Sequence, residues 1–263
     1  MADSAPRPTG EMGEDLRLSG FESEVYRKVG GAELVIHIHR PADAASPSPA
    51  IVFYHGGGWL TGMPAQFGEH CKHLARKGMT GLAVEYRLMR SHGVTAWECV
   101  EDAAAAFKWT GDNAARLGID PARIGAGGGS AGGLLAATLG TCPILSPDER
   151  PAALVLFNPI LDLSDEKWSS RFPPGRWQDA SPAQHVSAGL PPTVIFHGRE
   201  DRTVPPEQAE HFSNLMAEAG NRCDLHLYEG VGHAFFNYAR RNGFYEKTVA
   251  EMDSFLESLG WIR

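Results

Sequence analysis

Cysteine is scarce and scattered in this sequence. The four cysteines stand far apart and form no C-x-x-C pair (Cys71, Cys99, Cys142 and Cys223). This spacing argues against a zinc knuckle, a dithiol redox pair and a disulfide scaffold. We expect free thiols that are buried or partly buried, although the spacing leaves room for one disulfide.

Long apolar runs and an excess of basic residues are also lacking. No stretch approaches the ~20 apolar residues that a membrane-spanning helix needs. Lys and Arg number 24 against 32 Asp and Glu, so the formal net charge is -8. A field of this sign does not attract phosphate backbones. Neither nucleic acid nor a membrane is therefore an expected partner.

The first twenty residues lack the apolar segment of a secretory signal. This start predicts a cytoplasmic protein if Met1 is the native first residue, and a secreted or periplasmic one if a signal peptide has been removed. Residues 1–20 are rich in Pro, Gly, Ser and acidic residues, which predicts a flexible arm. The remainder, 21–263, shows no internal repeat and no break in composition, and 43% of the chain is apolar. We expect a single globular domain there.

Strand-like and helix-like patterns alternate through this domain. The predicted strands cover 21–29, 33–40, 50–54, 81–85, 124–126, 153–157, 193–196 and 225–228, and the predicted helices cover 66–77, 98–115, 131–139, 206–218 and 244–259. Such alternation predicts an α/β fold with a mostly parallel, eight-stranded twisted sheet and helices on both faces. The first two strands, joined by Gly30-Gly31, should form an antiparallel hairpin at one edge. Residues 163–190 fit no period, and loops of that length are usually functional or disordered.

A G-x-S-x-G pattern at Gly128, Ser130 and Gly132 lies between a predicted strand and a predicted helix. A serine on such a sharp turn needs small neighbours, because the backbone is crowded there. The helix start that follows favours negative charge near the serine oxygen. The alternative is a glycine-rich turn with an incidental serine.

A second glycine cluster, His55-Gly56-Gly57-Gly58-Trp59, follows the predicted strand 50–54. Consecutive glycines leave backbone amides uncovered, and such amides can stabilise an oxyanion. No phosphate-binding pattern accompanies them. A merely flexible turn is the alternative interpretation.

Asp201 and His233 each follow a predicted strand. Parallel strands bring the loops at their carboxyl ends to one edge of the sheet, where these residues and Ser130 can meet. Nucleophilic catalysis by serine needs a histidine base and a carboxylate that orients it. In isolation Asp201 could be a loop ion-pair acid and His233 a surface histidine. Other candidates for the carboxylate that orients the histidine are Asp162, Asp165 and Glu200.

These motifs resemble the hormone-sensitive-lipase-like esterases of the α/β-hydrolase fold, marked by H-G-G-G, G-x-S-A-G-G, D-x-x-V and G-H-x-F. The resemblance runs from about residue 21 to the end of the chain. It implies that Ser130 is the nucleophile, His233 the general base and Asp201 the orienting acid. The N–H groups of Gly57, Gly58 and Ala131 would form the oxyanion hole, and His55 would brace the glycine loop.

Two departures from the family pattern bear on the substrate. The usual A-P-E-x-x-F-P segment is replaced by residues 89–97, and only a short polar arm precedes the edge strands, so no full cap domain is expected. The chain in this respect resembles the short acetyl xylan esterases and related carbohydrate deacetylases. Trp59 and Phe236, or its neighbour Phe235, are candidate walls of an acyl pocket; ordinary core aromatics are the alternative.

No cofactor or metal is predicted. His37 and His39, like His70 and His73, have spacings that permit metal ligation, but no third ligand accompanies either pair. We therefore interpret them as solvated or packing histidines.

The sequence as a whole predicts a serine carboxylesterase that hydrolyses short acyl esters, acetyl esters above all, through an acyl-enzyme. The expected partner is a small-molecule or carbohydrate ester, with acetylated xylan as an example, and the oligomeric state is open. One alternative is a serine peptidase of the prolyl-oligopeptidase type, although nothing here supplies its propeller. The other is a noncatalytic interaction module, which would normally lack a member of the triad.

Overall fold

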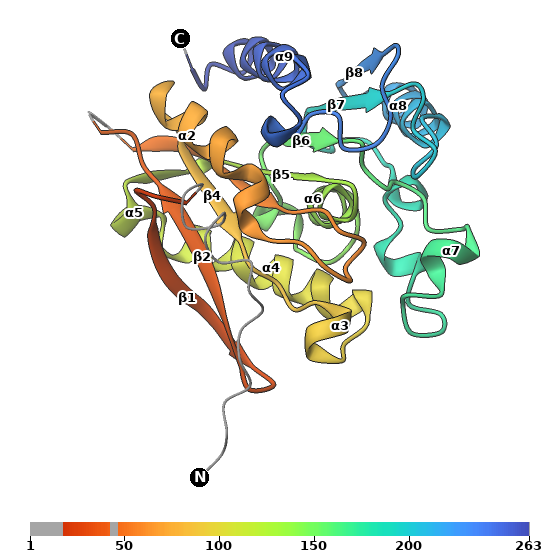
Figure 1. Cartoon of the computed structure of the whole chain (residues 1–263), viewed down its shortest axis with the longest axis horizontal. Helices are drawn as coiled ribbons and strands as arrows, with labels where there is room; N and C mark the ends of the chain where they lie inside the picture. Colours follow the sequence, from red (N-terminus) through yellow and green to blue (C-terminus); the bar gives the residue numbers. More distant parts are fainter. Residues whose placement is uncertain (1–17, 43–46, 263) are drawn as a thin grey trace.

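The computed structural model describes residues 18–42 and 47–262. Most of the predicted arm, residues 1–17, lies outside this range. In the described part, eight strands form one sheet in the order β1-β2-β4-β3-β5-β6-β7-β8 (Figure 1). The strands are β1 Glu22–Val29, β2 Ala32–His39, β3 Ser48–Tyr54, β4 Thr80–Val84, β5 Ile119–Gly129, β6 Leu154–Phe157, β7 Thr193–Gly198 and β8 Cys223–Tyr228. The predicted eight-stranded α/β fold is confirmed.

The first two strands form the predicted antiparallel hairpin at one edge. Gly30 and Gly31 make its turn with φ angles of +57° and +81°, the left-handed values that a tight two-residue hairpin turn requires. β2 pairs antiparallel with β4, whereas all further neighbours, from β4-β3 to β7-β8, pair in parallel. The carboxyl ends of these parallel strands therefore share one edge.

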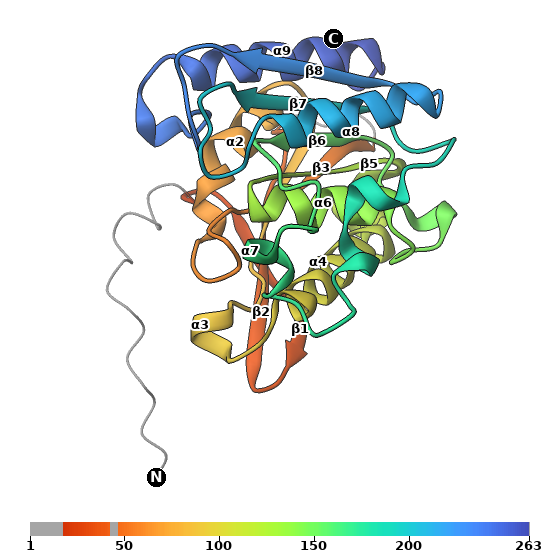
Figure 2. The ribbon, with the colours of Figure 1, turned by 90° about the vertical axis from the view of Figure 1, so that its right-hand side faces the viewer.

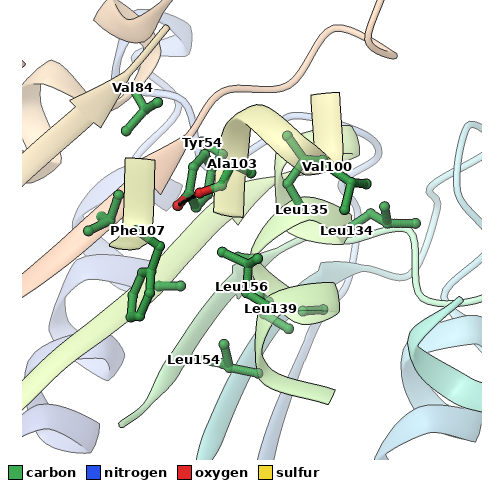
Figure 3. Packing of buried hydrophobic residues seen from close by; sticks show 14 of the residues in the cluster. Tyr54, Val84, Val100, Ala103, Phe107, Leu134, Leu135, Leu139, Leu154 and Leu156 are labelled. Atoms are coloured by element: carbon green, nitrogen blue, oxygen red, sulfur yellow. Dashed lines mark hydrogen bonds between the residues drawn. The ribbon is translucent and has the colours of Figure 1, made fainter. Parts of the chain in front are cut away.

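Two hydrophobic clusters cover the two faces of the sheet, because alternate side chains of each strand point to opposite sides. Ala50 and Val52 belong to the cluster with the helices α4 (Ala96–Asp112), α6 (Ala131–Thr141) and α8 (Glu207–Glu218). Ile51 and Phe53 belong to the cluster with α2 (Gly68–Arg76) and α9 (Phe244–Ser258). Figure 3 shows part of the first cluster, where the Tyr54 hydroxyl donates to the carbonyl oxygen of Ala103 at 2.9 Å. Figure 2 shows α8 and α9 on opposite sides of β7 and β8.

The five predicted helices are present with shifted ends. They are α2 Gly68–Arg76, α4 Ala96–Asp112, α6 Ala131–Thr141, α8 Glu207–Glu218 and α9 Phe244–Ser258. A 3-10 turn, Pro64–Phe67, precedes α2, and the short helix α5 Ala114–Leu117 follows α4. Thr95 and Glu98 form a capping box that begins α4 two residues earlier than predicted. None of the helices in the part described is both long and apolar enough to cross a membrane.

Besides α5, two short helices were not predicted: α3 Met89–His92 and α7 Glu166–Ser169. The second lies in the aperiodic segment 163–190, together with 3-10 turns at Gln178–Ala180 and Pro182–His185. Trp168 and Phe172 of this segment are buried and meet the ring of Trp59 edge-on. The segment is thus packed onto the glycine loop.

Candidate active site

Ser130 occupies the sharp turn between β5 and α6. Its φ of 55° and ψ of -118° are unusual for a residue with a side chain. A Cβ atom at Gly128 would lie 2.3 Å from the carbonyl oxygen of Gly132, and one at Gly132 would lie 2.0 Å from that of Tyr54. The two glycines of the motif are therefore required by the close approach of backbone on either side of Ser130.

The structure brings Ser130, His233 and Asp201 together from three different loops. His233 Nε2 lies 2.9 Å from Ser130 Oγ, and His233 Nδ1 lies 2.6 Å from Asp201 Oδ2. A proton on Nδ1, shared with the carboxylate, leaves Nε2 free to accept the serine proton. Nucleophile, base and orienting acid can therefore act in this order.

The competing acids are engaged elsewhere. Asp162 Oδ1 accepts a hydrogen bond from the Ser164 amide at 2.8 Å, and the Asp165 side chain caps α7. Glu200 is exposed. None of these carboxylates is hydrogen-bonded to His233, which leaves Asp201 as its acidic partner.

Asp201 is stabilised as a carboxylate by donors around it. Thr203 and Val204 donate their amides to Oδ1 at 2.8 and 3.0 Å, and the buried His197 Nε2 lies 3.3 Å from Oδ2. Burial by itself raises the pKa of Asp201, but the hydrogen bonds from His197, His233 and Val204 together outweigh it. Its pKa is held well below the usual range, so the side chain is ionised at neutral pH.

Asn158 supports the histidine loop and was not predicted. It follows β6, is fully buried with φ +36°, and accepts the Ala234 amide on its Oδ1 at 3.0 Å. This bond fixes the residue after His233. Its position directly after a strand was the only signal in the sequence.

The carbonyl groups of the glycine loop all accept hydrogen bonds. His55 Nδ1 donates to the Gly56 carbonyl, and the Leu60 and Thr61 amides donate to the Gly57 carbonyl. The Met89 amide donates to the Trp59 carbonyl. Gly58 accepts from Arg171 Nη1. The amides of Gly57, Gly58 and Ala131, by contrast, have no partner among the described residues. These are the N–H groups available to a negatively charged oxygen.

His55 lies beneath this loop. Its ring stacks on Tyr86 with 4.2 Å between centroids, and the Tyr86 hydroxyl donates to the His55 carbonyl at 2.7 Å. Burial lowers the pKa of His55 to about 4, which the hydrogen bond to Gly56 only partly opposes. The imidazole is therefore neutral at pH 7, and Gln66 adds a further anchor by accepting the Gly56 amide at 2.6 Å.

The aromatic residues considered as walls of an acyl pocket lie in the core, as the alternative interpretation expects. Trp59 is 0% and Phe236 1% exposed, and Phe235 is also buried. Trp59 has φ +61°, and its indole packs edge-on against Trp168 and Phe172. Phe236 stacks on Phe157. Both act as packing beneath the site.

A cavity of about 360 Å³ opens beside the glycine loop instead. It is lined by Gly56, Gly57, Gly62, Met63, Ala65, Gln66, Glu69, Asn237, Tyr238, Ala239 and Arg240. Met63 and Tyr238 are 38% and 44% exposed, and only one further large apolar side chain in the described residues is exposed to this degree. Exposed apolar side chains gathered at a cavity are typical of a binding surface.

The cysteines and the paired histidines lie outside the site described above. All four cysteines are free. His39 stacks on Phe21, His73 pairs with Asp253, and His70 lies in an aromatic cluster. The described residues contain no group of three or more potential metal ligands.

Two family models match the chain. One, described as alpha/beta hydrolase fold, matches residues 51–180, and the other, the dienelactone hydrolase family, matches residues 120–263. Carboxylesterase NlhH of Mycobacterium tuberculosis is 26% identical over 245 residues, covering 80% of this chain and 73% of that protein. Esterase LipC of the same species is 27% identical, over 72% and 53% of the two chains.

A solved structure is more similar. The thermophilic esterase Est2 of Thermogutta terrifontis, in its propionate-bound form, is 41% identical, covers 93% of this chain and 96% of its own, and superposes with a TM-score of 0.88. Identity and coverage at this level, together with the strand order and the serine turn, establish the relationship. The chain belongs to the hormone-sensitive-lipase-like group of α/β-hydrolases and is a carboxylic ester hydrolase.

Proposed function

We propose that the protein hydrolyses esters of short acyl groups, acetyl esters above all, with Ser130, His233 and Asp201 as its catalytic triad. The observation that supports this most strongly is the continuous hydrogen-bonded chain from Ser130 Oγ through His233 to Asp201. The three unpartnered amides of Gly57, Gly58 and Ala131 form the oxyanion hole in this proposal.

The reaction has two steps. Ser130 Oγ attacks the ester carbonyl carbon while His233 Nε2 takes the hydroxyl proton, and Asp201 stabilises the imidazolium that forms. The carbonyl oxygen becomes negative against the amides, each of which contributes about 3 kcal/mol in the transition state. The bond to the alcohol oxygen then breaks, and the alcohol leaves with the proton from His233. Water hydrolyses the acyl-enzyme by the same route and restores Ser130.

The proposed acyl preference draws on the neighbouring structures. Est2 was solved with propionate and with butyrate bound, and also phosphorylated by paraoxon. Propionate and butyrate are short acids, and paraoxon is an organophosphate of the kind that esterifies activated serines. These findings on a relative 41% identical favour the same acyl class here.

We further propose that the cavity beside Gly57 receives the alcohol part of the ester. Its volume of about 360 Å³ lies within the range of ordinary ligand sites and far exceeds the needs of an acetyl group. Gln66, Asn237 and Arg240 offer polar contacts beside the exposed faces of Met63 and Tyr238. A hydroxyl-rich alcohol such as a sugar suits this lining, so acetylated carbohydrates are the proposed substrate class.

The triad is tested with p-nitrophenyl acetate, butyrate and octanoate on the wild type and Ser130→Ala. We expect kcat/KM to fall from acetate or butyrate to octanoate, and Ser130→Ala to lose at least about a thousandfold in kcat. Paraoxon should add one diethylphosphoryl group to wild-type Ser130, located by peptide mass spectrometry. Activity of Ser130→Ala above one per cent, or labelling at another residue, would refute the assignment.

The alcohol class is tested separately by measuring acetate released from acetylated xylan, peracetylated glucose and p-nitrophenyl acetate at matched ester concentration. Preference for the carbohydrate esters supports the proposed substrate. Hydrolysis of the aryl ester alone would reject carbohydrates and leave the triad untouched.

A further inference from the structure

Arg171 connects the aperiodic segment 163–190 to the glycine loop. Its Nη1 donates a hydrogen bond to the carbonyl oxygen of Gly58 at 2.7 Å, across 113 residues of sequence. Its own backbone oxygen accepts the Ala96 amide at 2.9 Å, which ties Arg171 to the start of α4. Arg171 therefore connects the glycine loop with the start of α4.

The guanidinium group of Arg171 has no carboxylate within 4 Å among residues 18–42 and 47–262. It lies instead near two indole rings, 5.2 Å from the centroid of Trp168 and 5.8 Å from that of Trp59. Burial lowers its pKa from the ordinary value, yet an arginine stays charged at neutral pH. A half-buried positive charge held by aromatic faces and one carbonyl needs an explanation, because buried charges are usually paired.

Gly58 is the point in the loop where an outside support matters most. Its φ of +63° and that of Gly57, +117°, are left-handed values that glycine adopts at little steric cost. Because glycine is also free to leave them, these residues do not fix the loop by themselves. The carbonyls of Gly56 and Gly57 are held by groups of the loop and its immediate neighbours, whereas the Gly58 carbonyl is held by a side chain 113 residues away. The fit is tight: a Cβ atom on Gly58 would lie 2.7 Å from Arg171 Nη1.

We propose that Arg171 is a positioning residue for the oxyanion hole: it fixes the Gly58 peptide so that the Gly57 and Gly58 amides are presented to the reacting carbonyl, and its charge favours a negative oxygen there. The inference rests on the proposed function. Among the described residues Arg171 forms no hydrogen bond with Ser130, and in this proposal it acts through Gly58. Its contribution belongs to the transition state, in which the oxygen becomes negative.

Arg171→Met and Arg171→Lys test this role, with p-nitrophenyl acetate as substrate. We expect kcat to fall ten- to a hundredfold in Arg171→Met while KM changes less than threefold, because an interaction made only in the transition state affects kcat. Arg171→Lys, which keeps the charge and loses the planar fork, should be intermediate. Added guanidinium at millimolar concentration should recover part of the activity of Arg171→Met.

A transition-state analogue separates positioning from general loosening of the fold. The inhibition constant of a trifluoromethyl ketone should rise across the variants in proportion to the loss of kcat/KM. Arg176→Met is the matched control: this arginine lies in the same segment, stacks on Trp97 and pairs with Asp179, and its loss should leave kcat unchanged.

Several outcomes would overturn the inference. They are an unchanged kcat in Arg171→Met, a loss carried mainly by KM, or a loss that Arg176→Met reproduces. If Arg171→Met does not fold, Arg171→Lys decides by the same inhibitor comparison. If one of these outcomes occurs while the wild type is active and labelled at Ser130, only the role of Arg171 is rejected. A wild type that is inactive and unlabelled would reject the proposed function.

Discussion

The imidazole of His197 lies against the carboxylate of Asp201, and both side chains are completely buried. His197 Nε2 is 3.3 Å from Asp201 Oδ2 and donates to the Val204 carbonyl at 3.0 Å. Oδ2 is therefore placed between two imidazoles, His197 on one side and His233 on the other. The strand β7 thus supplies a support for the acid as well as the loop that bears it.

Removing this support should weaken the triad without abolishing it. In His197→Phe the carboxylate loses the nearby Nε2–H, which it shares with the Val204 carbonyl. Losing a partner of a buried polar group costs about 1–3 kcal/mol. We expect kcat/KM for p-nitrophenyl acetate to fall about tenfold, far less than in Ser130→Ala. His197→Gln, which retains a donor, should recover part of the loss.

The matched control is His226→Phe on the neighbouring strand β8, whose ring stacks on Phe196 away from Asp201. It should keep full activity. Equal losses in the two variants would mean that packing at this edge, and not the donor to Asp201, sets the rate.

The buried His70 should make the stability of the fold depend on pH. Its ring is fully buried among aromatic side chains, neither ring nitrogen has a partner, and burial lowers its pKa from 6.5 to about 3. Between these values the unfolded chain binds the proton and the folded one does not, so stability falls as pH falls from 6.5 towards 3. His55, with a pKa of about 4, acts in the same direction.

From pH 6.5 to 5 each of these histidines should remove on the order of 2 kcal/mol of unfolding free energy. In His70→Phe one of the two contributions disappears, so the decline over this interval should be about 2 kcal/mol smaller. Urea unfolding at a series of pH values measures it. His211→Phe, at an exposed position on α8, should leave the decline as in wild type; a wild-type slope in His70→Phe would contradict the prediction.

Replacing Gly132 and replacing Gly111 by alanine should have opposite effects on stability. Both lie in helices, where replacing glycine by alanine ordinarily stabilises by up to about 1 kcal/mol. A Cβ atom at Gly111 meets nothing within 4 Å, whereas one at Gly132 would lie 2.0 Å from the Tyr54 carbonyl oxygen and 2.4 Å from that of His55. Gly111→Ala should therefore raise the melting temperature.

Gly132→Ala should lower the melting temperature and remove most activity, because neither backbone carbonyl can move without shifting β3 and the glycine loop. Thermal unfolding of the two variants under identical conditions is the measurement. A stable, fully active Gly132→Ala would show that the serine turn tolerates a wider approach than the structure has.

The parts of the fold that the sequence predicted are those with local signals. Continuous apolar runs identified β3, β6 and β7, which are buried on both faces. The start of β5 was missed because Pro121 and Ala122 are exposed there and break the apolar pattern. The serine turn and the glycine loop were predictable because each directly follows a strand.

The supports of the site carry no such signal. Arg171 and Asn158 act through contacts with residues brought near only by the fold, as in the bond from Arg171 to Gly58. The direction of Trp59 was equally hidden, since it depends on a left-handed φ of +61° at a residue with a large side chain. Proximity to a motif in sequence therefore did not predict which side chains are exposed beside it.

The proposed alcohol site makes the final prediction. Tyr238 is 44% exposed at the edge of the cavity beside Gly57, and an aromatic face there can pack against the alcohol part of an ester. In Tyr238→Ala we expect kcat/KM to fall about fivefold to tenfold for acetates of bulky alcohols and to stay within twofold for ethyl acetate. The acyl preference, measured with acetate, butyrate and octanoate esters of one alcohol, should not change. Met63→Ala, which removes another exposed apolar side chain of the lining, should act in the same direction. A changed acyl preference with an unchanged alcohol preference would instead assign this cavity to the acyl group. In the proposed mechanism the acyl and alcohol parts of the ester lie on different sides of the carbonyl that Ser130 attacks.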